Sequence, residues 1–149
     1  MGVNTDLEGA SFAAPAPYRV SAEAIAAFAA ATKATNPAHT DPAAARALGY
    51  PDLVAPPTFA VVPSQRAEGL YISSPESGID FDRVVHGQEQ FTYTRPIVAG
   101  DELDAVCHVD GIRMAGGNAM ITTRTELSSQ GEPVVTVTSM IVVRGDDNA

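Results

Sequence analysis

The sequence contains little lysine, little basic charge overall and no long apolar run. Lys33 is the only lysine, and 18 acidic residues against nine basic ones give a net charge of −9. Such an excess of negative charge argues against a nucleic acid or an anionic membrane surface as the partner. No apolar stretch approaches the roughly 18 residues that a membrane-spanning helix needs. We therefore expect neither nucleic-acid binding nor membrane binding.

Residues that hold disulfides, metals and nucleotides are equally scarce. Cys107 is the single cysteine, which excludes an internal disulfide and fits a reducing compartment. The three histidines, His39, His86 and His108, are far apart and lack metal-ligand spacing. The sequence carries neither a glycine-rich phosphate-binding pattern nor a secretory signal at MGVNTDLEGA. We expect a cytoplasmic protein without a metal or a nucleotide cofactor.

The chain has a helical, alanine-rich first half and a β-rich second half. At 149 residues its length fits one domain. Helices and strands that are segregated in this way predict an α+β fold, with the helices on one face of an antiparallel sheet. We expect a flexible segment over residues 1–10, one domain over residues 11–145 and an acidic tail over residues 146–149.

Three helices are predicted from their start and stop signals. Ser21 is placed to cap a helix of about twelve residues. Asp41, followed directly by proline, predicts the start of a short helix, and Gly49 predicts its end. Thr58 is placed to cap a third helix that runs to about Leu70.

Four strands follow the helices, separated by turn residues. They are expected at about residues 83–94, 102–113, 119–128 and 133–144. Connected by three consecutive hairpins, they would form an antiparallel meander, and a short strand near Gly9–Phe12 would make five. Within the second predicted strand, Cys107 alternates with apolar residues and is expected in the core. His108 lies on the polar face and is expected in solvent.

Residues 31–59, ATKATNPAHTDPAAARALGYPDLVAPPTF, hold the most informative pattern. They resemble the signature of the MaoC-like (R)-specific enoyl-thioester hydratases and (3R)-hydroxyacyl-thioester dehydratases, of the FAS1-like dehydratase type. The matching residues are Asn36, Pro37, His39, Asp41, Gly49, Ala55 and Pro56. A second segment, FTYTRPIVAGDEL at residues 91–103, also resembles the family. The resemblance covers Tyr18 to Val143 and implies a hotdog fold, in which about five antiparallel strands wrap around a central helix.

The resemblance also identifies two missing groups. In the family, an aspartate and a histidine five residues apart perform acid–base chemistry, and a backbone N–H at the start of the central helix faces the thioester oxygen. His39 matches the histidine, but Ala34 stands at the aspartate position. Pro57 stands at the position of the donor glycine and has no N–H. Loss of a general acid or base lowers rates by about 100- to 10,000-fold, and loss of an oxyanion donor by about 100- to 1000-fold.

Some relatives are heterodimers in which one subunit is catalytic and the other lacks the Asp/His pair and shapes the acyl channel. Subunits of the second kind often carry the pattern A-P-x-T-F, as residues 55–59 do here. The hypothesis is that this chain is the substrate-binding, non-catalytic partner in a (3R)-hydroxyacyl-thioester dehydratase of fatty-acid-type metabolism. Its substrate would be carried on coenzyme A or acyl carrier protein, without a cofactor. The alternatives are an acyl-thioester-binding homodimer without turnover, an active homodimer that uses His39 with another base, and a purely structural partner.

His39 is the candidate catalytic residue, and its alternatives are a relic of lost chemistry or a histidine bonded within a turn. The resemblance suggests further residues for substrate binding: Asn36, Pro57, Thr58, Phe59, His86 and Arg95. Arg95 would meet a phosphate of coenzyme A or of a carrier protein's prosthetic arm; the alternative is an ion pair with an acidic neighbour such as Asp101. His86 would lie near the central helix, and the alternative is a strand-end histidine.

Overall fold

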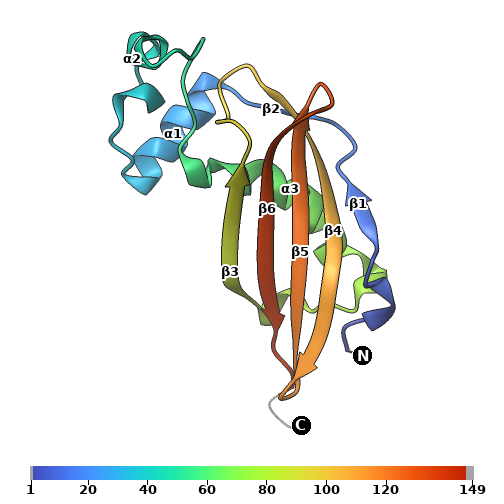
Figure 1. Cartoon of the computed structure of the whole chain (residues 1–149). Helices are drawn as coiled ribbons and strands as arrows, with labels where there is room; N and C mark the ends of the chain where they lie inside the picture. Colours follow the sequence, from blue (N-terminus) through green and yellow to red (C-terminus); the bar gives the residue numbers. More distant parts are fainter. Residues whose placement is uncertain (1, 147–149) are drawn as a thin grey trace.

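The computed structural model describes residues 2–146 (Figure 1). The strands are β1 (Ser11–Ala13), β2 (Tyr18–Arg19), β3 (Val84–Tyr93), β4 (Glu102–Ala115), β5 (Asn118–Ser129) and β6 (Glu132–Val143). The α-helices are α1 (Ala22–Thr32), α2 (Pro42–Ala47) and α3 (Val61–Ser73). Five short 3-10 helices are η1 (Thr5–Leu7), η2 (Pro37–His39), η3 (Pro57–Ala60), η4 (Pro75–Ser77) and η5 (Phe81–Arg83). Residues 147–149 of the expected acidic tail lie outside the described residues.

The strands form one antiparallel sheet around α3, which lies across its inner face (Figure 1). Their order is β1-β4-β5-β6-β3, and β2 also pairs with β4. This arrangement confirms the predicted α+β hotdog fold with a central helix. The sheet has six strands rather than about five because the two-residue strand β2 joins the edge of β4.

The predicted meander is wrong at its first connection. β3 pairs with β6 at the far edge of the sheet, so two hairpins remain, β4–β5 and β5–β6. The chain that follows β3 bonds to distant segments: Thr94 N donates to Val134 O at 2.8 Å, and Ala99 N donates to Leu53 O at 2.9 Å. These bonds carry residues 94–101 across to β4, so the predicted turn at Ala99–Asp101 joins two strands that are not neighbours.

Two of the three predicted helix starts are confirmed. The side chain of Ser21 accepts a hydrogen bond from Ala24 N at 3.0 Å, and that of Asp41 accepts one from Ala43 N at 2.9 Å. Thr58 does not cap α3, which begins at Val61 without a side-chain cap. The paired prolines before Thr58 instead begin the η3 turn that leads into α3. Among residues 2–146, no helix is both long enough and apolar enough to cross a membrane.

The N-terminal segment that was expected to be loose has defined contacts over residues 4–10. Asn4 N donates to Ser77 O at 2.8 Å, and Gly9 N donates to Val109 O at 2.8 Å. The side chain of Asn4 also accepts from Asp6 N at 3.0 Å and begins η1. The two backbone bonds depend on partners about seventy and one hundred residues away, which local sequence does not reveal.

A row of polar side chains crosses the core between the sheet and α3. One apolar cluster lies around Phe59, Ile97, Leu103, Leu127 and Val137, and the other around Tyr71, Val109, Ile121 and Ile141. Between them, Glu89 on β3 is opposite Ser139 on β6, which is opposite Thr123 on β5. Glu68 on α3 completes the row by accepting a hydrogen bond from the Thr123 hydroxyl at 2.8 Å.

Candidate functional site

A cavity of about 390 Å³ lies where η2, the segment before α3 and the end of β3 meet. Its lining residues come from both sequence motifs: Asn36, His39, Val54, Ala55, Pro57, Tyr93, Thr94, Arg95 and Pro96. The two motifs are joined by backbone bonds, since Val54 N donates to Ala38 O at 3.0 Å and Ala55 N donates to Ile97 O at 2.8 Å. The structure therefore brings together four predicted site residues, Asn36, His39, Pro57 and Arg95.

His39 is held in one orientation by the backbone. Its ring Nδ1 lies 2.6 Å from the carbonyl oxygen of Val54, and the residue is only 8% exposed. Because a carbonyl oxygen can only accept, Nδ1 carries the proton, and a neutral ring keeps Nε2 as its acceptor nitrogen. Asn36 supports this placement, because its side chain accepts from Ala38 N at 3.0 Å and starts η2.

The described residues that line the cavity include no carboxylate, since none of them is Asp or Glu. Ala34, at the position of the family's aspartate, follows α1, and its N–H is used in a 2.8 Å hydrogen bond to Ala29 O. His39 therefore has no acidic partner within this cavity.

Pro57 removes the donor that the family places at the start of the central helix. It is the first residue of η3 and has no N–H. Its carbonyl accepts a hydrogen bond from the hydroxyl of Tyr93. Burial raises the pKa of that hydroxyl to about 12, so Tyr93 remains a neutral donor at ordinary pH. Sequence reasoning did not select Tyr93, although its inward position in the aromatic strand was a usable signal.

Arg95 lines the cavity but is already paired. Its guanidinium donates to both carboxylate oxygens of Asp101, at 2.8 and 3.1 Å. Asp101 also accepts from Val98 N at 2.9 Å. The ion-pair alternative is thus the observed one, although the Arg95 side chain stays 39% exposed beside the cavity.

Three predicted binding residues lie elsewhere. Phe59 is 1% exposed and packs edge-on against Phe28, with ring centroids 5.4 Å apart, so it belongs to the core. Thr58 is exposed and does not line this cavity. His86 lies near the opposite end of β3 from Tyr93 and lines a different groove, beside α3.

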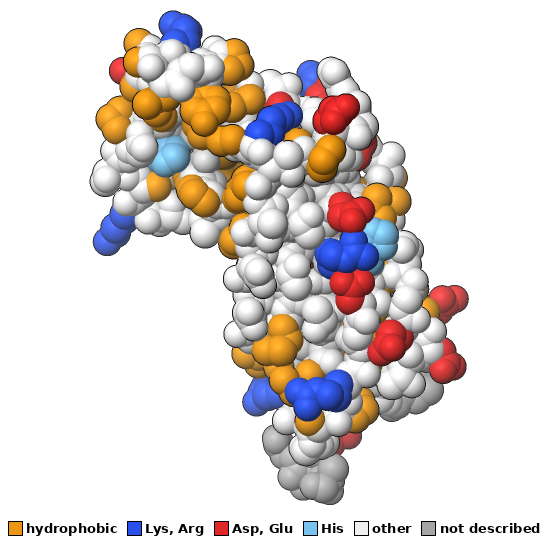
Figure 2. All heavy atoms as spheres, viewed as in Figure 1, with side chains coloured by type: hydrophobic (Ala, Val, Ile, Leu, Met, Phe, Trp, Pro, Cys, Tyr) orange, Lys and Arg blue, Asp and Glu red, His pale blue; other side chains and the backbone are white. Residues whose placement is uncertain are grey.

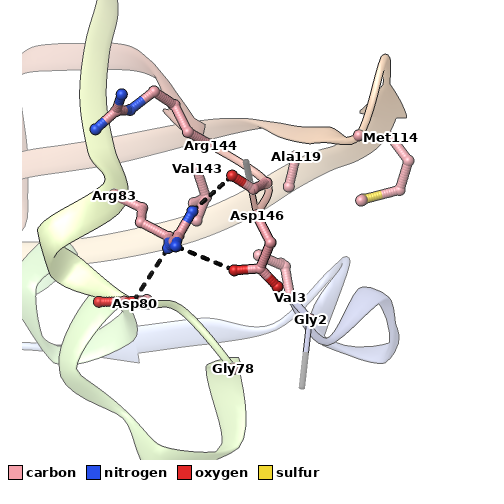
Figure 3. Close-up of a pocket in the computed structure, with 12 residues that line it drawn as sticks. Gly2, Val3, Gly78, Asp80, Arg83, Met114, Ala119, Val143, Arg144 and Asp146 are labelled. Atoms are coloured by element: carbon pink, nitrogen blue, oxygen red, sulfur yellow. Dashed lines mark hydrogen bonds and ion pairs between the residues drawn. The ribbon is translucent and has the colours of Figure 1, made fainter. Parts of the chain in front are cut away.

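A third hollow, of about 260 Å³, lies near the C-terminal end of β6 (Figure 3). Arg83 lines this hollow, and its guanidinium lies 3.1 Å from Asp146 and 3.5 Å from Asp80. The same side chain donates to the carbonyl of Gly145 at 2.6 Å. These contacts tie η5 to the end of β6 and use the guanidinium for structure.

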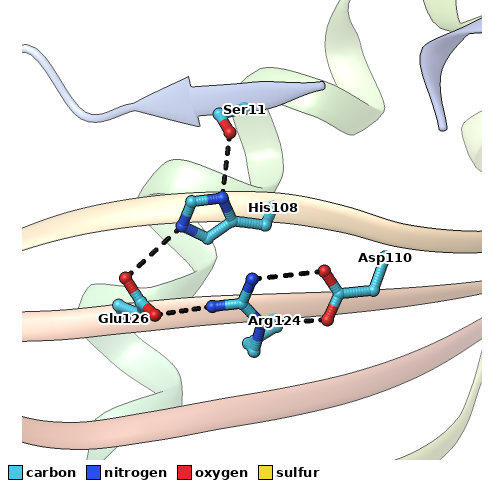
Figure 4. Close-up of polar contacts among 5 residues, drawn as sticks. All are labelled: Ser11, His108, Asp110, Arg124 and Glu126. Carbon is cyan, nitrogen blue, oxygen red and sulfur yellow. Dashed lines mark hydrogen bonds and ion pairs between the residues drawn. The ribbon is translucent and has the colours of Figure 1, made fainter. Parts of the chain in front are cut away.

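A polar network lies across β1, β4 and β5 (Figure 4). Ser11 Oγ is 2.9 Å from His108 Nδ1, and His108 Nε2 is 3.4 Å from Glu126. Arg124 bridges Glu126 and Asp110 at 2.5 and 2.9 Å. The predicted solvent-facing histidine is therefore half-buried within a network. None of the five residues lines any of the three cavities, so the network serves to join strands.

Hydrophobic side chains gather over the end of the molecule formed by α1 and α2 (Figure 2). The charged residues of the Ser11–Glu126 network belong to the sheet surface instead. The cavity around His39 lies at the apolar end, between η2 and the end of β3. Its surroundings suit an apolar ligand better than a charged one.

Comparison with known proteins identifies the family. Residues 6–137 match the FAS1-like dehydratase domain region. A UPF0336 protein of Clavibacter michiganensis subsp. michiganensis is 49% identical over 148 residues, which are 99% of each chain. A UPF0336 protein of Saccharopolyspora erythraea is 50% identical over 129 residues, which are 86% of this chain and 83% of that one.

Solved structures agree with the fold. The chain superposes on the truncated HadBC (3R-hydroxyacyl-ACP dehydratase) complex of Mycobacterium tuberculosis with a TM-score of 0.85 and 28% identity, covering 93% of this chain and 98% of that chain. A MaoC-like dehydratase is 33% identical with a TM-score of 0.87, and the match covers 95% of this chain and 43% of that one. This chain belongs to the FAS1-like dehydratase family, on a hotdog fold shared with MaoC-like dehydratases.

Proposed function

We propose that this chain is the substrate-binding, non-catalytic subunit of a (3R)-hydroxyacyl-thioester dehydratase of fatty-acid-type metabolism. The observation that carries the proposal is a cavity with a backbone-oriented His39 whose lining, in the described part of the chain, offers neither a carboxylate nor a donor N–H at Pro57. The similarity to HadBC, whose name describes a dehydratase complex, supports this reaction class.

The proposed reaction needs more groups than the cavity offers. Dehydration of a 3-hydroxyacyl thioester requires a base for the α-proton, an acid for the departing hydroxyl and a donor for the enolate oxygen. Of these groups, the described lining of this cavity offers only the imidazole of His39. The acid, the base and the oxyanion donor would therefore all come from the active site of a catalytic MaoC-like partner, which carries an intact Asp/His pair.

What remains in this subunit suits substrate binding. Val54, Ala55 and Pro57 give the cavity apolar walls that would contact the acyl chain. Arg95 lies beside them with its side chain partly exposed, so it would attract a phosphate of coenzyme A or of acyl carrier protein. No cofactor is required for this role. A single, buried cysteine fits the proposed cytoplasmic location.

The free edge of the sheet supports the proposed pairing. β3 is the last strand in the sheet and has ten residues. A strand edge with unpaired backbone groups is a ready site for strand addition by another chain. The proposed partner would therefore extend the sheet along β3, as a second hotdog subunit.

One observation favours a second candidate, an active homodimer. The Val54 carbonyl orients His39 with Nε2 as an acceptor, which is the arrangement a general base needs. In that case a base or acid from elsewhere would replace the missing aspartate. An acyl-thioester-binding homodimer without turnover is the remaining alternative.

An assay of crotonyl-coenzyme A hydration, monitored by the loss of the substrate's absorbance, tests the proposal. The purified chain, its His39→Ala variant and the chain co-expressed with a MaoC-like partner from the same organism should be compared. We expect hydration only from the pair, and little change when His39 of this chain is replaced. Hydration by the chain alone that disappears in His39→Ala would instead establish the active homodimer. A pair that is no more active than the partner alone would refute the proposed role.

A further inference from the structure

A groove of about 330 Å³ lies beside β3, the open edge of the sheet. Five residues of α3 line it, together with Phe81 and His86. Phe81 is 71% exposed and Val85 on β3 is 47% exposed, so apolar surface adjoins the groove. An open strand edge next to an exposed apolar groove is suited to bind a second chain.

The groove contains a carboxylate without a basic partner. Glu68 is 3% exposed and lines the groove from α3. Within residues 2–146, its side chain has one hydrogen bond, from the neutral hydroxyl of Thr123 at 2.8 Å. A carboxylate this deeply buried normally requires a counter-charge or several donors.

A second carboxylate lies on the neighbouring edge strand. Glu89 is half-buried on the inner face of β3, opposite Ser139. The hydroxyl of Ser139 is itself buried and without a hydrogen-bond partner among the described residues. Burial of Glu89, and to a smaller extent the charge of Glu68, raise the pKa of the Glu89 carboxyl, while the nearby Ser139 hydroxyl and His86 partly oppose this shift.

No lysine or arginine of this chain forms an ion pair with either carboxylate. All nine lysines and arginines fall within residues 2–146, and none of them forms an ion pair with Glu68 or Glu89. His86 also lines the groove, and its effect on the pKa of the Glu89 carboxyl is smaller than that of burial.

We propose that Glu68 and Glu89 select the subunit that docks along β3: they accept a basic side chain from that subunit and oppose docking of a second copy of this chain. The inference rests on the proposed pairing of this chain with a different, catalytic subunit. The partner is thus defined by its chemistry, as a strand-adding chain with an arginine or lysine beside the shared edge.

Symmetry explains why a second copy is disfavoured. A two-fold contact places the same surface patch of each subunit against itself. Two copies would bring four carboxylates together in a complex of net charge −18, twice the −9 of one chain. Like charges in a partly buried interface are poorly screened, so the carboxylates would disfavour the pair.

Self-association of the purified chain, measured by sedimentation velocity at about pH 7.5, tests the proposal. The wild type should be compared with Glu68→Gln/Glu89→Gln, and with Asp6→Asn/Asp104→Asn as the control. The control removes the same charge from exposed positions away from β3. We expect the double glutamine variant to self-associate at least about tenfold more tightly than the wild type, and the control to match the wild type.

Two further variants keep the test decisive. Glu89→Gln alone changes a half-buried position and should tighten self-association even if the double variant folds poorly. Glu89→Arg supplies the missing cation and should form mixed dimers with wild type, visible by native mass spectrometry. Equal self-association in wild type, Glu89→Gln and the control, or no mixed dimers with Glu89→Arg, would overturn the proposal. Because these measurements involve no dehydratase partner and no substrate, their failure would leave the proposed function standing.

Discussion

The Nδ1 atom of His39 lies 2.6 Å from the carbonyl oxygen of Val54, and within residues 2–146 no acidic side chain lines the cavity around it. The bond holds the imidazole in a base-competent tautomer. His39 is thus oriented by the backbone, and Ala34 stands at the position where the resemblance to the MaoC-like family implies an aspartate. Because this oriented histidine lies in a cavity whose walls are mostly apolar, acid–base chemistry can be sought by substitution of the neighbouring positions.

Restoring the two missing groups should produce hydratase activity. We expect Ala34→Asp/Pro57→Gly to raise crotonyl-coenzyme A hydration by at least about 100-fold over the wild-type chain, since a general acid or base alone contributes about that much. The matched control is Ala34→Asn/Pro57→Gly, which fills the same space without a titratable group. Activity of the restored variant should disappear when His39→Ala is added. Equal rates in the Asp and Asn variants would show that position 34 does not reach the substrate.

Tyr93→Phe should destabilise the start of the central helix. The hydroxyl of Tyr93 donates to the carbonyl of Pro57, and its removal leaves that carbonyl without this donor. We expect the free energy of unfolding, measured with urea, to fall by about 1 kcal/mol. Tyr50→Phe is the control, because the Tyr50 side chain is also half-buried but its hydroxyl has no hydrogen bond among residues 2–146. A similar loss in both variants would contradict a specific role for the Tyr93 hydroxyl.

Thr123→Val should leave the carboxylate of Glu68 buried without a donor. The 2.8 Å bond between them joins β5 to α3, so we expect a loss of about 1–3 kcal/mol in the free energy of unfolding. Thr125→Val is the control, since Thr125 is equally buried two residues further along β5. In a Glu68→Gln background the same Thr123 substitution should have a smaller effect. Additive effects of the two substitutions would mean that the pair is not coupled.

Stability should fall at alkaline pH, in part through Cys107. Burial raises the pKa of the Cys107 thiol from 9.0 to about 12. Between those values the unfolded chain has lost a proton that the folded chain keeps, so the free energy of unfolding decreases as pH rises. Tyr71 and Tyr93 act in the same direction, since burial raises the pKa of each from 10.0 to about 12. The contribution of Cys107 is complete below about pH 9.

The substitution Cys107→Ala distinguishes the thiol's contribution to the pH dependence of stability from that of the two tyrosines. We expect its unfolding free energy to depend less steeply on pH between about 9 and 12 than that of the wild type. The native thiol should also react slowly with a disulfide reagent, because Cys107 is fully buried. Rapid labelling of the folded protein, or identical pH slopes in both proteins, would contradict this placement.

Local patterns predicted much of the secondary structure and part of the site. The caps at Ser21 and Asp41 are confirmed because a cap involves only a few neighbouring residues. The cap at Thr58 is wrong because the preceding prolines impose a different turn. His39 and Asn36 both line the cavity. Phe59, predicted to bind substrate, is instead buried in the core, which a local pattern does not reveal.

The sequence alone determined the α+β class and the four long strands, because these follow from residue type and short-range periodicity. That a carboxylate at Ala34 and an N–H at Pro57 are missing is what the resemblance to the MaoC-like family implies. The tertiary structure decided which strands are neighbours. It placed β3 beside β6, bonded Tyr93 to Pro57 and brought Glu68 to Thr123. The two side-chain bonds join residues that are 36 and 55 positions apart in the sequence. Only packing of the whole chain around α3 selects such pairs, since no local preference of either residue specifies its partner.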